Sequence, residues 1–274
     1  MARSALTIET TFPGTTQIEA GGIGLLRVQE WLTLQGHGVV LDGRPGPATS
    51  EAIRSFQNER RLKPDGVVGP VTWSYLIAPM VRATGPADKI LAEMTGPGGD
   101  ISLNGMIVLL AHQHLREHPR EVGGQNRGPW VRLYCDGNEG DAWAWCAGFA
   151  SYVVRQARAG SGHPGDISPG GGIRTYSCDA WANGFKADGM LIPQATPEVV
   201  AAKVKPGCIF FLVDPKNLND RHHTGIVTEV AKDGSWVKTI EGNTNDEGSR
   251  EGYEVCARTR AVGKLDFGIV AKRA

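Results

Sequence analysis

The sequence has no excess of charge of either sign. Lysine and arginine together number 29, and aspartate and glutamate together also number 29. A chain balanced in this way has no general attraction for a polyanion, so its composition does not favour nucleic acid or an anionic membrane as the partner. Residues of hydrophobic type make up 41% of the 274 positions, which is enough for real cores and, at this length, for two domains.

Long apolar runs are also missing. The N-terminal segment, residues 1–14, lacks an apolar stretch of the length that a signal peptide needs, and no later run is long enough to span a bilayer. We therefore expect synthesis in the cytoplasm without a signal peptide and no membrane insertion. If the target lies outside the cytoplasm, another machine must deliver the protein.

Cysteine is scarce, and its spacing fits no structural metal site. The chain has five cysteines, and an odd number cannot all be bridged internally. No His-Glu-x-x-His motif accompanies the three histidines of residues 103–118, so zinc is not expected there either. Reduced thiols are the simpler expectation, with one disulfide left open. The cysteines are Cys135, Cys146, Cys178, Cys208 and Cys256.

An internal repeat lies near the start of the chain. The stretch Asp42–Thr49 recurs as Asp65–Thr72, and each copy begins with Asp-Gly and continues with Gly-Pro. Asp-Gly favours a turn, and Gly-Pro is typical of a helix entry in which proline takes the first helical position. Apolar residues at helical spacing predict three helices. These residues are Leu25, Val28, Leu32, Ala52, Ile53, Phe56, Trp73 and Leu76.

The repeat, together with Val28-Gln29 and Phe56-Gln57, resembles the peptidoglycan-binding domain of bacterial and phage wall hydrolases. The resemblance implies peptidoglycan as the partner and a small three-helix domain at 15–80, after a tail at 1–14. Asp42 and Asp65 are candidate substrate-binding residues, although a purely structural role in the two turns is the favoured interpretation. Residues 81–100, rich in Gly and Pro around one short helix, are expected to be a linker.

Cys146 stands where a buried helix is expected to begin. The positive end of a helix favours thiolate over thiol, and its free backbone N–H groups can receive a developing oxyanion. This position predicts a nucleophile, against the alternative of a small buried hydrophobe. The other four cysteines show no such helix start and are expected to be structural. The helix is indicated by Ala147, Phe149, Tyr152, Val153 and Ala157.

A predicted hairpin brings distant polar residues together. Two alternating segments, 224–230 and 236–241, flank a loop at 232–234 that suits a three-residue hairpin turn. His223 would then lie opposite Asn243 and diagonal to Glu241, within side-chain reach. A two-residue loop would shift the register by one position and scatter this set. The favoured register pairs Val230 with Trp236, Ile226 with Ile240 and His223 with Asn243.

The ordered motifs at Trp145–Ala147, Pro206–Phe211, His223–Val227 and Glu241–Asn243 resemble the CHAP family of cysteine, histidine-dependent amidohydrolases and peptidases. The resemblance extends over about residues 101–271, and we assign the domain to 101–274. It implies an α+β chain, with a papain-like fold around a central antiparallel sheet in this domain. It also implies cleavage of peptidoglycan amide bonds.

Residue roles carry over from that resemblance. Cys146 would be the nucleophile, His223 the base, and Glu241 the group that orients His223, while Asn243 supports the imidazole or an oxyanion. Where the family has Gly-Asp before the central strand, this chain has Gly207 followed by Cys208, which puts a polar role there in doubt.

Two further features surround Cys146. Trp143 and Trp145 are candidates for lining a substrate groove, although one of them is expected to be core. Asp136, Asn138 and Asp141 supply oxygen donors where some relatives bind calcium, and a hydrated turn explains them equally well. We expect no obligatory cofactor or metal, with calcium as the alternative.

Several functional alternatives stay open. A phage-type endolysin, released to the cell wall, and an injected antibacterial effector fit the residues equally. A sister family of wall peptidases with a second catalytic histidine is disfavoured, because no histidine follows His223. A non-catalytic wall-binding protein is the alternative from another class. We expect a monomer, and the residues do not select between a muramoyl-alanine amidase and a peptide endopeptidase.

Overall fold

The computed structural model describes residues 4–95, 101–160, 170–245 and 252–271. The chain forms two compact units that are interleaved along the sequence. Unit 1 comprises Met1–Arg82 with Arg120–Asp141, and unit 2 comprises Ala83–Pro119 with Ala142–Ala274. The sequence predicts one boundary between domains along the chain, at the linker 81–100. The two units meet at three boundaries along the chain, because the segment 120–141 packs with the N-terminal helices.

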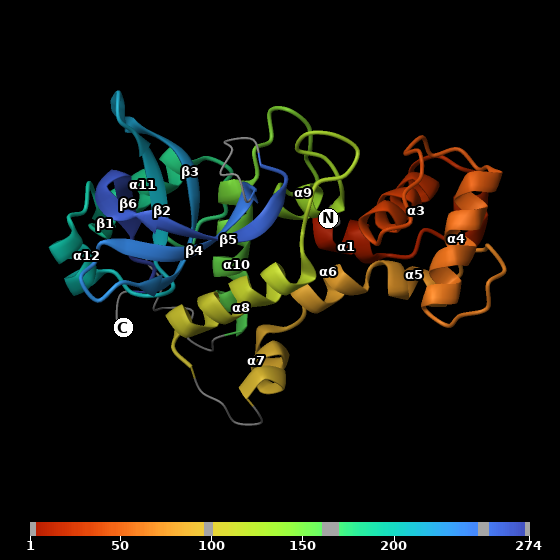
Figure 1. Cartoon of the computed structure of the whole chain (residues 1–274), viewed down its shortest axis with the longest axis horizontal. Helices are drawn as coiled ribbons and strands as arrows, with labels where there is room; N and C mark the ends of the chain where they lie inside the picture. The colour runs from red at the N-terminus through yellow and green to blue at the C-terminus, as the bar shows by residue number, and fades with distance from the viewer. Residues whose placement is uncertain (1–3, 96–100, 161–169, 246–251, 272–274) are drawn as a thin grey trace. The chain divides into compact units, whose positions relative to one another are not determined.

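Unit 1 is helical (Figure 1). The three predicted helices are present as α3 (Ile23–Leu34), α4 (Pro47–Glu59) and α5 (Pro70–Leu76). Both repeats open their helices as expected, since Pro47 and Pro70 stand in the first turn, directly after an extended glycine. The unit contains four further helices that the sequence analysis did not anticipate. They are α1 (Ala5–Thr10), α2 (Thr15–Glu19), α6 (Ala78–Ala83) and α9 (Pro129–Tyr134).

Two buried glutamines hold the repeated turns. Gln29 donates from Nε2 to Asp42 Oδ1 at 3.0 Å and to Thr49 Oγ1 at 3.3 Å. Its Oε1 accepts from the backbone N–H of Gly43 at 2.8 Å. The side chain thus supplies a hydrogen-bond partner for a buried backbone group of the turn. The second copy makes the same bonds with Gln57, Asp65, Thr72 and Gly66.

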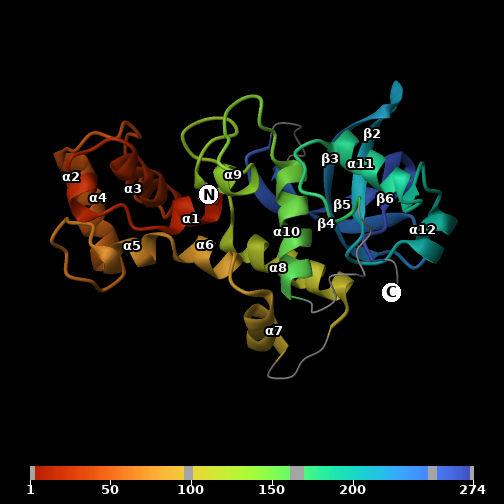
Figure 2. The ribbon, with the colours of Figure 1, turned by 180° about the vertical axis from the view of Figure 1, so that it is seen from behind.

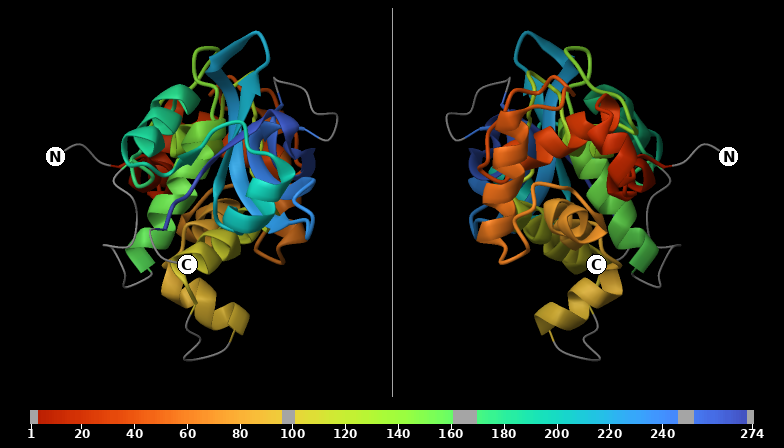
Figure 3. Two further views of the ribbon diagram at one scale, coloured as in Figure 1. Left: turned by 90° about the vertical axis from the view of Figure 1, so that its left-hand side faces the viewer. Right: turned by 90° about the vertical axis from the view of Figure 1, so that its right-hand side faces the viewer.

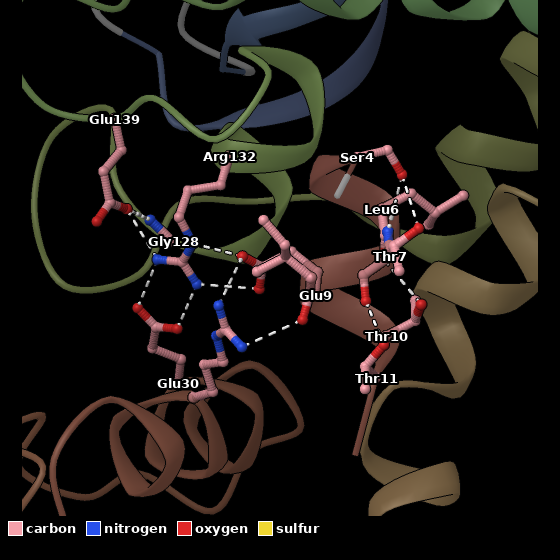
Figure 4. Close-up of polar contacts among 12 residues, drawn as sticks. Ser4, Leu6, Thr7, Glu9, Thr10, Thr11, Glu30, Gly128, Arg132 and Glu139 are labelled. Carbon is pink, nitrogen blue, oxygen red and sulfur yellow. Dashed lines mark hydrogen bonds and ion pairs between the residues drawn. The ribbon is translucent and has the colours of Figure 1, made fainter. Parts of the chain in front are cut away.

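A buried charge cluster ties α9 to the N-terminal helices within unit 1. Arg132 donates to Glu9 from Nε at 2.8 Å, to Glu30 from an NH2 group at 2.6 Å, and to Glu139 from the other at 2.9 Å. Figure 4 shows the guanidinium enclosed by the three carboxylates. The side chains of Arg132, Glu9 and Glu30 are 11%, 2% and 7% exposed. Long-range pairing of this kind explains why residues 120–141 join unit 1.

Unit 2 contains the sheet, which confirms the predicted α+β class with an antiparallel sheet. The strand order is β1-β6-β2-β3-β4-β5, and the neighbouring strands pair antiparallel. The strands are β1 (Leu191–Ile192), β2 (Ile209–Asp214), β3 (Asn217–Val230), β4 (Trp236–Thr244), β5 (Glu254–Ala261) and β6 (Leu265–Gly268).

Helices pack against this sheet. α10 contacts β3 and β4, and α11 contacts β3, so both lie on one side of the strands (Figures 2 and 3). A core cluster that includes Phe210, Val227 and Phe267 packs with Val200 of α12. Among the described residues, none of the helices combines the length and the apolar composition that crossing a membrane requires. The helices are α7 (Ala87–Thr95), α8 (Leu103–Glu117), α10 (Cys146–Gly160), α11 (Cys178–Ala187) and α12 (Pro197–Lys203), with a short 3₁₀ turn, η1 (Val262–Lys264).

The β3–β4 hairpin has the predicted register only in part. Ile226 pairs with Ile240 as expected, but Val230 pairs with Val237, so the predicted pairing with Trp236 is wrong. The loop is one residue longer than predicted, because the Ala231 N–H bonds to the Trp236 carbonyl at 3.0 Å. A bulge between Val227 and Glu229 absorbs the extra residue and restores the register toward the site.

The histidines of α8 differ from the expected solvated or capping role at one position. His118 is the helix cap, with a left-handed φ of 50°, and pairs with Glu254 at 2.6 Å. His114 is instead buried and bonds to Gln156 Oε1 at 3.0 Å. Burial lowers the pKa of His114 to about 4, against the effect of that hydrogen bond, so this imidazole is neutral at physiological pH.

Candidate active site

Cys146 is the first residue of α10, as predicted from the sequence. Its side chain is buried, and the backbone N–H of Ala147 contributes to a lowered pKa of the thiol. The first N–H groups of a helix have no intrahelical partner, and they carry the positive end of the helix dipole. A thiolate at this position is therefore stabilised, and an oxyanion that forms beside it has donors to accept.

His223 on β3 lies between Cys146 and Glu241. Its Nε2 is 2.8 Å from Glu241 Oε2, and the interaction with Cys146 contributes to a raised pKa of the imidazole. Glu241, on the adjacent strand β4, is fully buried. The diagonal placement that the hairpin predicted therefore brings these two side chains together. The predicted pairing of His223 with Asn243 is not among the β3–β4 pairs of the described residues, which begin at Ile226 and Ile240.

Arg260 on β5 fixes the carboxylate of Glu241. Its Nε donates to Oε1 at 2.6 Å, one NH2 group donates to Oε2 at 2.5 Å, and Thr239 Oγ1 donates to Oε1 at 2.5 Å. Burial raises the pKa of Glu241, but the bonds from Arg260 and then His223 outweigh it and lower the pKa to about 2. The carboxylate is thus ionised throughout the physiological range. Sequence analysis missed Arg260, which lies 19 residues beyond Glu241.

Cys178 is a second thiol at the site, and the expectation that it does not begin a helix is wrong. Its Sγ lies 3.8 Å from Cys146 Sγ, and Cys178 opens α11 with Ser177 as the helix cap. Ser177 followed by an acidic residue in the first turn is a recognisable helix start, so the sequence did carry a signal for this position. All five cysteines are free thiols in the structure.

The surroundings of Cys146 and His223 favour an ion pair. The hydrogen bond with Cys178 holds the pKa of Cys146 well below its usual range, against burial, and His223 lowers it further. For His223, burial lowers the pKa, but the bonds with Cys146 and Glu241 outweigh it and raise the pKa to about 9. Between these two pKa values the pair is a thiolate beside an imidazolium, which is the reactive form of a cysteine nucleophile.

Asn243 and the two tryptophans have different surroundings. Asn243 is buried with a left-handed φ of 55°, and its Oδ1 has no hydrogen-bond partner among the described residues. Trp145 is fully buried and lies against Gly242, so it is the core member of the pair and does not line a groove. Trp143 is half-buried beside the ring of Tyr176, at 5.5 Å between centroids, and stays a candidate for substrate contact.

The remaining candidates belong to unit 1 or to the core. Asp42 and Asp65 are exposed, and the backbone N–H bonds that close their own turns lower their pKa values. Their Oδ1 atoms therefore serve the scaffold. The described residues include no cluster of three His, Cys, Asp or Glu side chains that fits a metal ion. Cys208 is buried in the core of unit 2, and burial raises its pKa to about 11, so the doubted polar role is not filled.

A groove of about 130 Å³ lies in unit 1 between the two repeats. Its walls are mainly apolar, with Leu25 and Ile53 on the helices and Gly66 and Val68 from the second turn. Thr49 and Ser50 add hydroxyls to the lining, and Glu19 adds a carboxylate. Neither Asp42 nor Asp65 is among the lining residues, so the predicted aspartates lie outside this concavity.

Comparisons with known proteins assign both parts of the chain. Residues 24–76 match the model of a peptidoglycan binding domain, and residues 136–243 match that of the CHAP domain. Among curated proteins, an uncharacterized protein in the bpoA1 3' region of Kitasatospora aureofaciens is 36% identical over 78 residues, or 28% of this chain. The chain spans 66% of that relative's length, and no solved structure gives a match. The CHAP match includes Cys146, His223, Glu241 and Asn243. The chain thus contains an N-terminal segment that matches a peptidoglycan-binding domain and a C-terminal segment that matches a CHAP domain.

Proposed function

We propose that this protein is a cell-wall hydrolase of the phage endolysin type, which cuts amide bonds of peptidoglycan with Cys146 as its nucleophile. The observation that carries the proposal is one buried line of groups, from the thiol at the start of α10 through His223 to Glu241. A wall-binding domain in the same chain supports peptidoglycan as the substrate. We further propose that the protein acts at the bacterial wall after release from the cell that makes it.

The chemistry would proceed through an acyl-enzyme. The Cys146 thiolate attacks the amide carbonyl carbon, and the carbonyl oxygen becomes an oxyanion beside the free N–H groups of α10. His223 donates its proton to the leaving amine, and the C–N bond breaks. A water molecule then gives a proton to His223 and attacks the thioester, which releases the carboxylate product and the thiol. Glu241 keeps the imidazole oriented and stabilises its charged form.

Wall binding would raise the concentration of substrate at the thiolate. A tethered binding domain makes the encounter with the scissile bond intramolecular, which increases the overall rate on insoluble walls without any new contact at the active site. We propose the groove between the two repeats as the wall contact, because its apolar walls with a few polar side chains suit the face of a sugar or a small side chain.

Mass spectrometry of digested peptidoglycan tests the proposal and identifies the bond. Purified wall material would be incubated with the wild type and with Cys146→Ala as the matched control. We expect products only with the wild type. Intact stem peptides separated from glycan would establish the amidase, whereas shortened stems or opened cross-links would establish the endopeptidase. Walls left unchanged, across several peptidoglycan types, would overturn the proposed function.

The pH profile should respond in opposite directions to two substitutions around His223. His223 must hold a proton to release the amine, so activity is lost as pH rises through its pKa of about 9. Glu241→Gln removes the negative charge that raises this pKa, and the alkaline limb should move to lower pH with a rate loss of roughly 10²-fold. Arg260→Gln removes a positive charge that opposes it, and the limb should move to higher pH. Initial rates of dye release from labelled walls at low substrate give both limbs.

The opposed signs separate electrostatics from general damage. A variant that merely loosened the fold would lower the rate at every pH without moving the limb. If both variants shifted the limb in the same direction, the assignment of the alkaline limb to His223 would be wrong.

A further inference from the structure

Cys178 is placed to react with Cys146. The two Sγ atoms are 3.8 Å apart although the residues are 32 positions apart in the sequence. They open two different helices, α10 and α11, which both pack against β3. A disulfide needs a sulfur separation of about 2.05 Å, so the thiols must approach by roughly 1.8 Å, a movement within the range of side-chain rotation.

The two thiols differ in reactivity. The hydrogen bond with Cys178 and the charge of His223 lower the pKa of Cys146, so Cys146 is the thiolate. The same hydrogen bond, then burial and the negative charge of Cys146, raise the pKa of Cys178, which stays a neutral thiol. An oxidant therefore meets one activated sulfur, with a second thiol held beside it. When Cys146 loses its charge through oxidation, its negative charge no longer opposes ionisation of Cys178, although burial still does.

We propose that Cys146 and Cys178 form a peroxide-responsive thiol pair, in which Cys178 captures oxidised Cys146 as a reversible disulfide. The inference deepens the proposed function, since it adds regulation to the same site. By forming the disulfide, Cys178 also protects the nucleophile from irreversible oxidation. Of the other three cysteines, Cys135 belongs to unit 1, Cys208 to the core cluster of unit 2, and Cys256 lies on β5 opposite Glu241. None of them is assigned a part in the pair.

The steps balance with hydrogen peroxide as the oxidant. The Cys146 thiolate attacks one peroxide oxygen, the O–O bond breaks, and hydroxide leaves to give the sulfenic acid. Cys178 then attacks the Cys146 sulfur, the S–O bond breaks, and a second hydroxide leaves. The two hydroxides take up the protons of the two thiols. The sum is two thiols and one peroxide converted to one disulfide and two waters, and a dithiol reductant restores both thiols.

Intact-mass and peptide mass spectrometry of the full chain test this proposal. After brief treatment with hydrogen peroxide and alkylation of the remaining thiols, the wild type should lose two hydrogen atoms and yield a Cys146–Cys178 cross-linked peptide. Cys178→Ser should gain two or three oxygen atoms on Cys146 instead, because no resolving thiol is present. Cys208→Ala, which removes a thiol from the core cluster of unit 2, is the matched control and should behave like the wild type.

Activity provides the second readout. The activity of each peroxide-treated variant is divided by the activity of the same variant with reduced thiols. A direct effect of Cys178 on the nucleophile therefore cancels from the comparison. Dithiothreitol should restore the peroxide-treated wild type fully and leave Cys178→Ser inactive. Oxygen addition to wild-type Cys146 without the cross-link, or full recovery of Cys178→Ser, would overturn the proposal. The cross-link is measured without substrate, so its formation in a protein that cuts no wall would refute the proposed function alone.

Discussion

Cys146→Ala should lose hydrolysis down to the background rate while it still binds peptidoglycan. Removing the nucleophile from a triad that acts as a unit costs on the order of 10⁶-fold in kcat, because the remaining members have nothing to activate. Cys146 lies in unit 2, whereas the predicted wall contact lies in unit 1. Dye release from labelled walls measures the first effect, and co-sedimentation with insoluble peptidoglycan measures the second.

Cys208→Ala is the control for this experiment too, since it deletes a buried thiol that lies in the core cluster of unit 2. It should retain a rate within about tenfold of the wild type, because an alanine there costs packing and not chemistry. Residual hydrolysis of that size in Cys146→Ala would assign the reaction to another group. Loss of wall binding in Cys146→Ala would show that binding depends on the catalytic unit.

Arg132→Ala should be the most destabilising of the charge substitutions. It leaves Glu9, Glu30 and Glu139 without their shared counter-charge, and two of these carboxylates are less than a tenth exposed. Breaking a buried ion pair from one side costs about 3–5 kcal/mol. We expect the free energy of unfolding to fall by that amount at neutral pH, as measured by urea denaturation.

The deficit should shrink in acid. Burial raises the pKa of Glu30 even with Arg132 present, and removing the arginine raises it further. A group whose folded pKa exceeds its unfolded value favours the fold below the unfolded pKa and loses that contribution as pH rises. The gap between wild type and Arg132→Ala should therefore be largest near pH 7 and close as pH falls and Glu30 takes up its proton.

An exposed arginine on the same unit is the matched control. Arg54 is 45% exposed and pairs with Glu51, at 3.4 Å and one helical turn away. Arg54→Ala should change the free energy of unfolding by no more than about 0.5 kcal/mol, since solvent screens such pairs. Equal losses from Arg54→Ala and Arg132→Ala would mean that the buried cluster contributes no more to the free energy of unfolding than an exposed ion pair does.

Deletion of the N-terminal helices is a poor substitute for these point changes. The truncation would remove Glu9 and Glu30 from Arg132, and it would also take Trp31 away from Trp130, whose rings lie 5.9 Å apart. Residues 120–141 would then expose a buried charge and a large apolar side chain. Lower activity of the truncated chain would mix loss of wall targeting with damage to a segment beyond residue 80.

Local pattern predicted those parts of the molecule whose determinants are near in sequence. The repeated Asp-Gly and Gly-Pro dipeptides predicted the entries of α4 and α5, and the helix start predicted the position of Cys146. The hairpin brought His223 to Glu241 although two details were wrong, because the longer loop and the bulge compensate each other. The spacing of apolar residues is the same whether a longer loop is compensated by a bulge or both are absent. It could therefore not reveal these two differences.

Features that depend on distant pairing could not be predicted from pattern. Cys178 approaches Cys146 because α10 and α11 pack on the same strand, and Arg260 reaches Glu241 across the β4–β5 pairing. The sequence around Arg132 does not indicate that this side chain is buried. Its three carboxylate partners become visible only in the fold. A period of 2 or 3.6 residues contains no information about which surfaces meet.

The Arg132 cluster also sets an order of events during synthesis. Glu9 and Arg132 are 123 positions apart, and Glu30 and Arg132 are 102 apart. At translation rates of roughly 5–20 residues per second, Arg132 is synthesised on the order of ten seconds after the first helices. Until then Glu9 and Glu30 must stay hydrated. The last step in folding unit 1 therefore follows the synthesis of α7 and α8, which belong to the other unit.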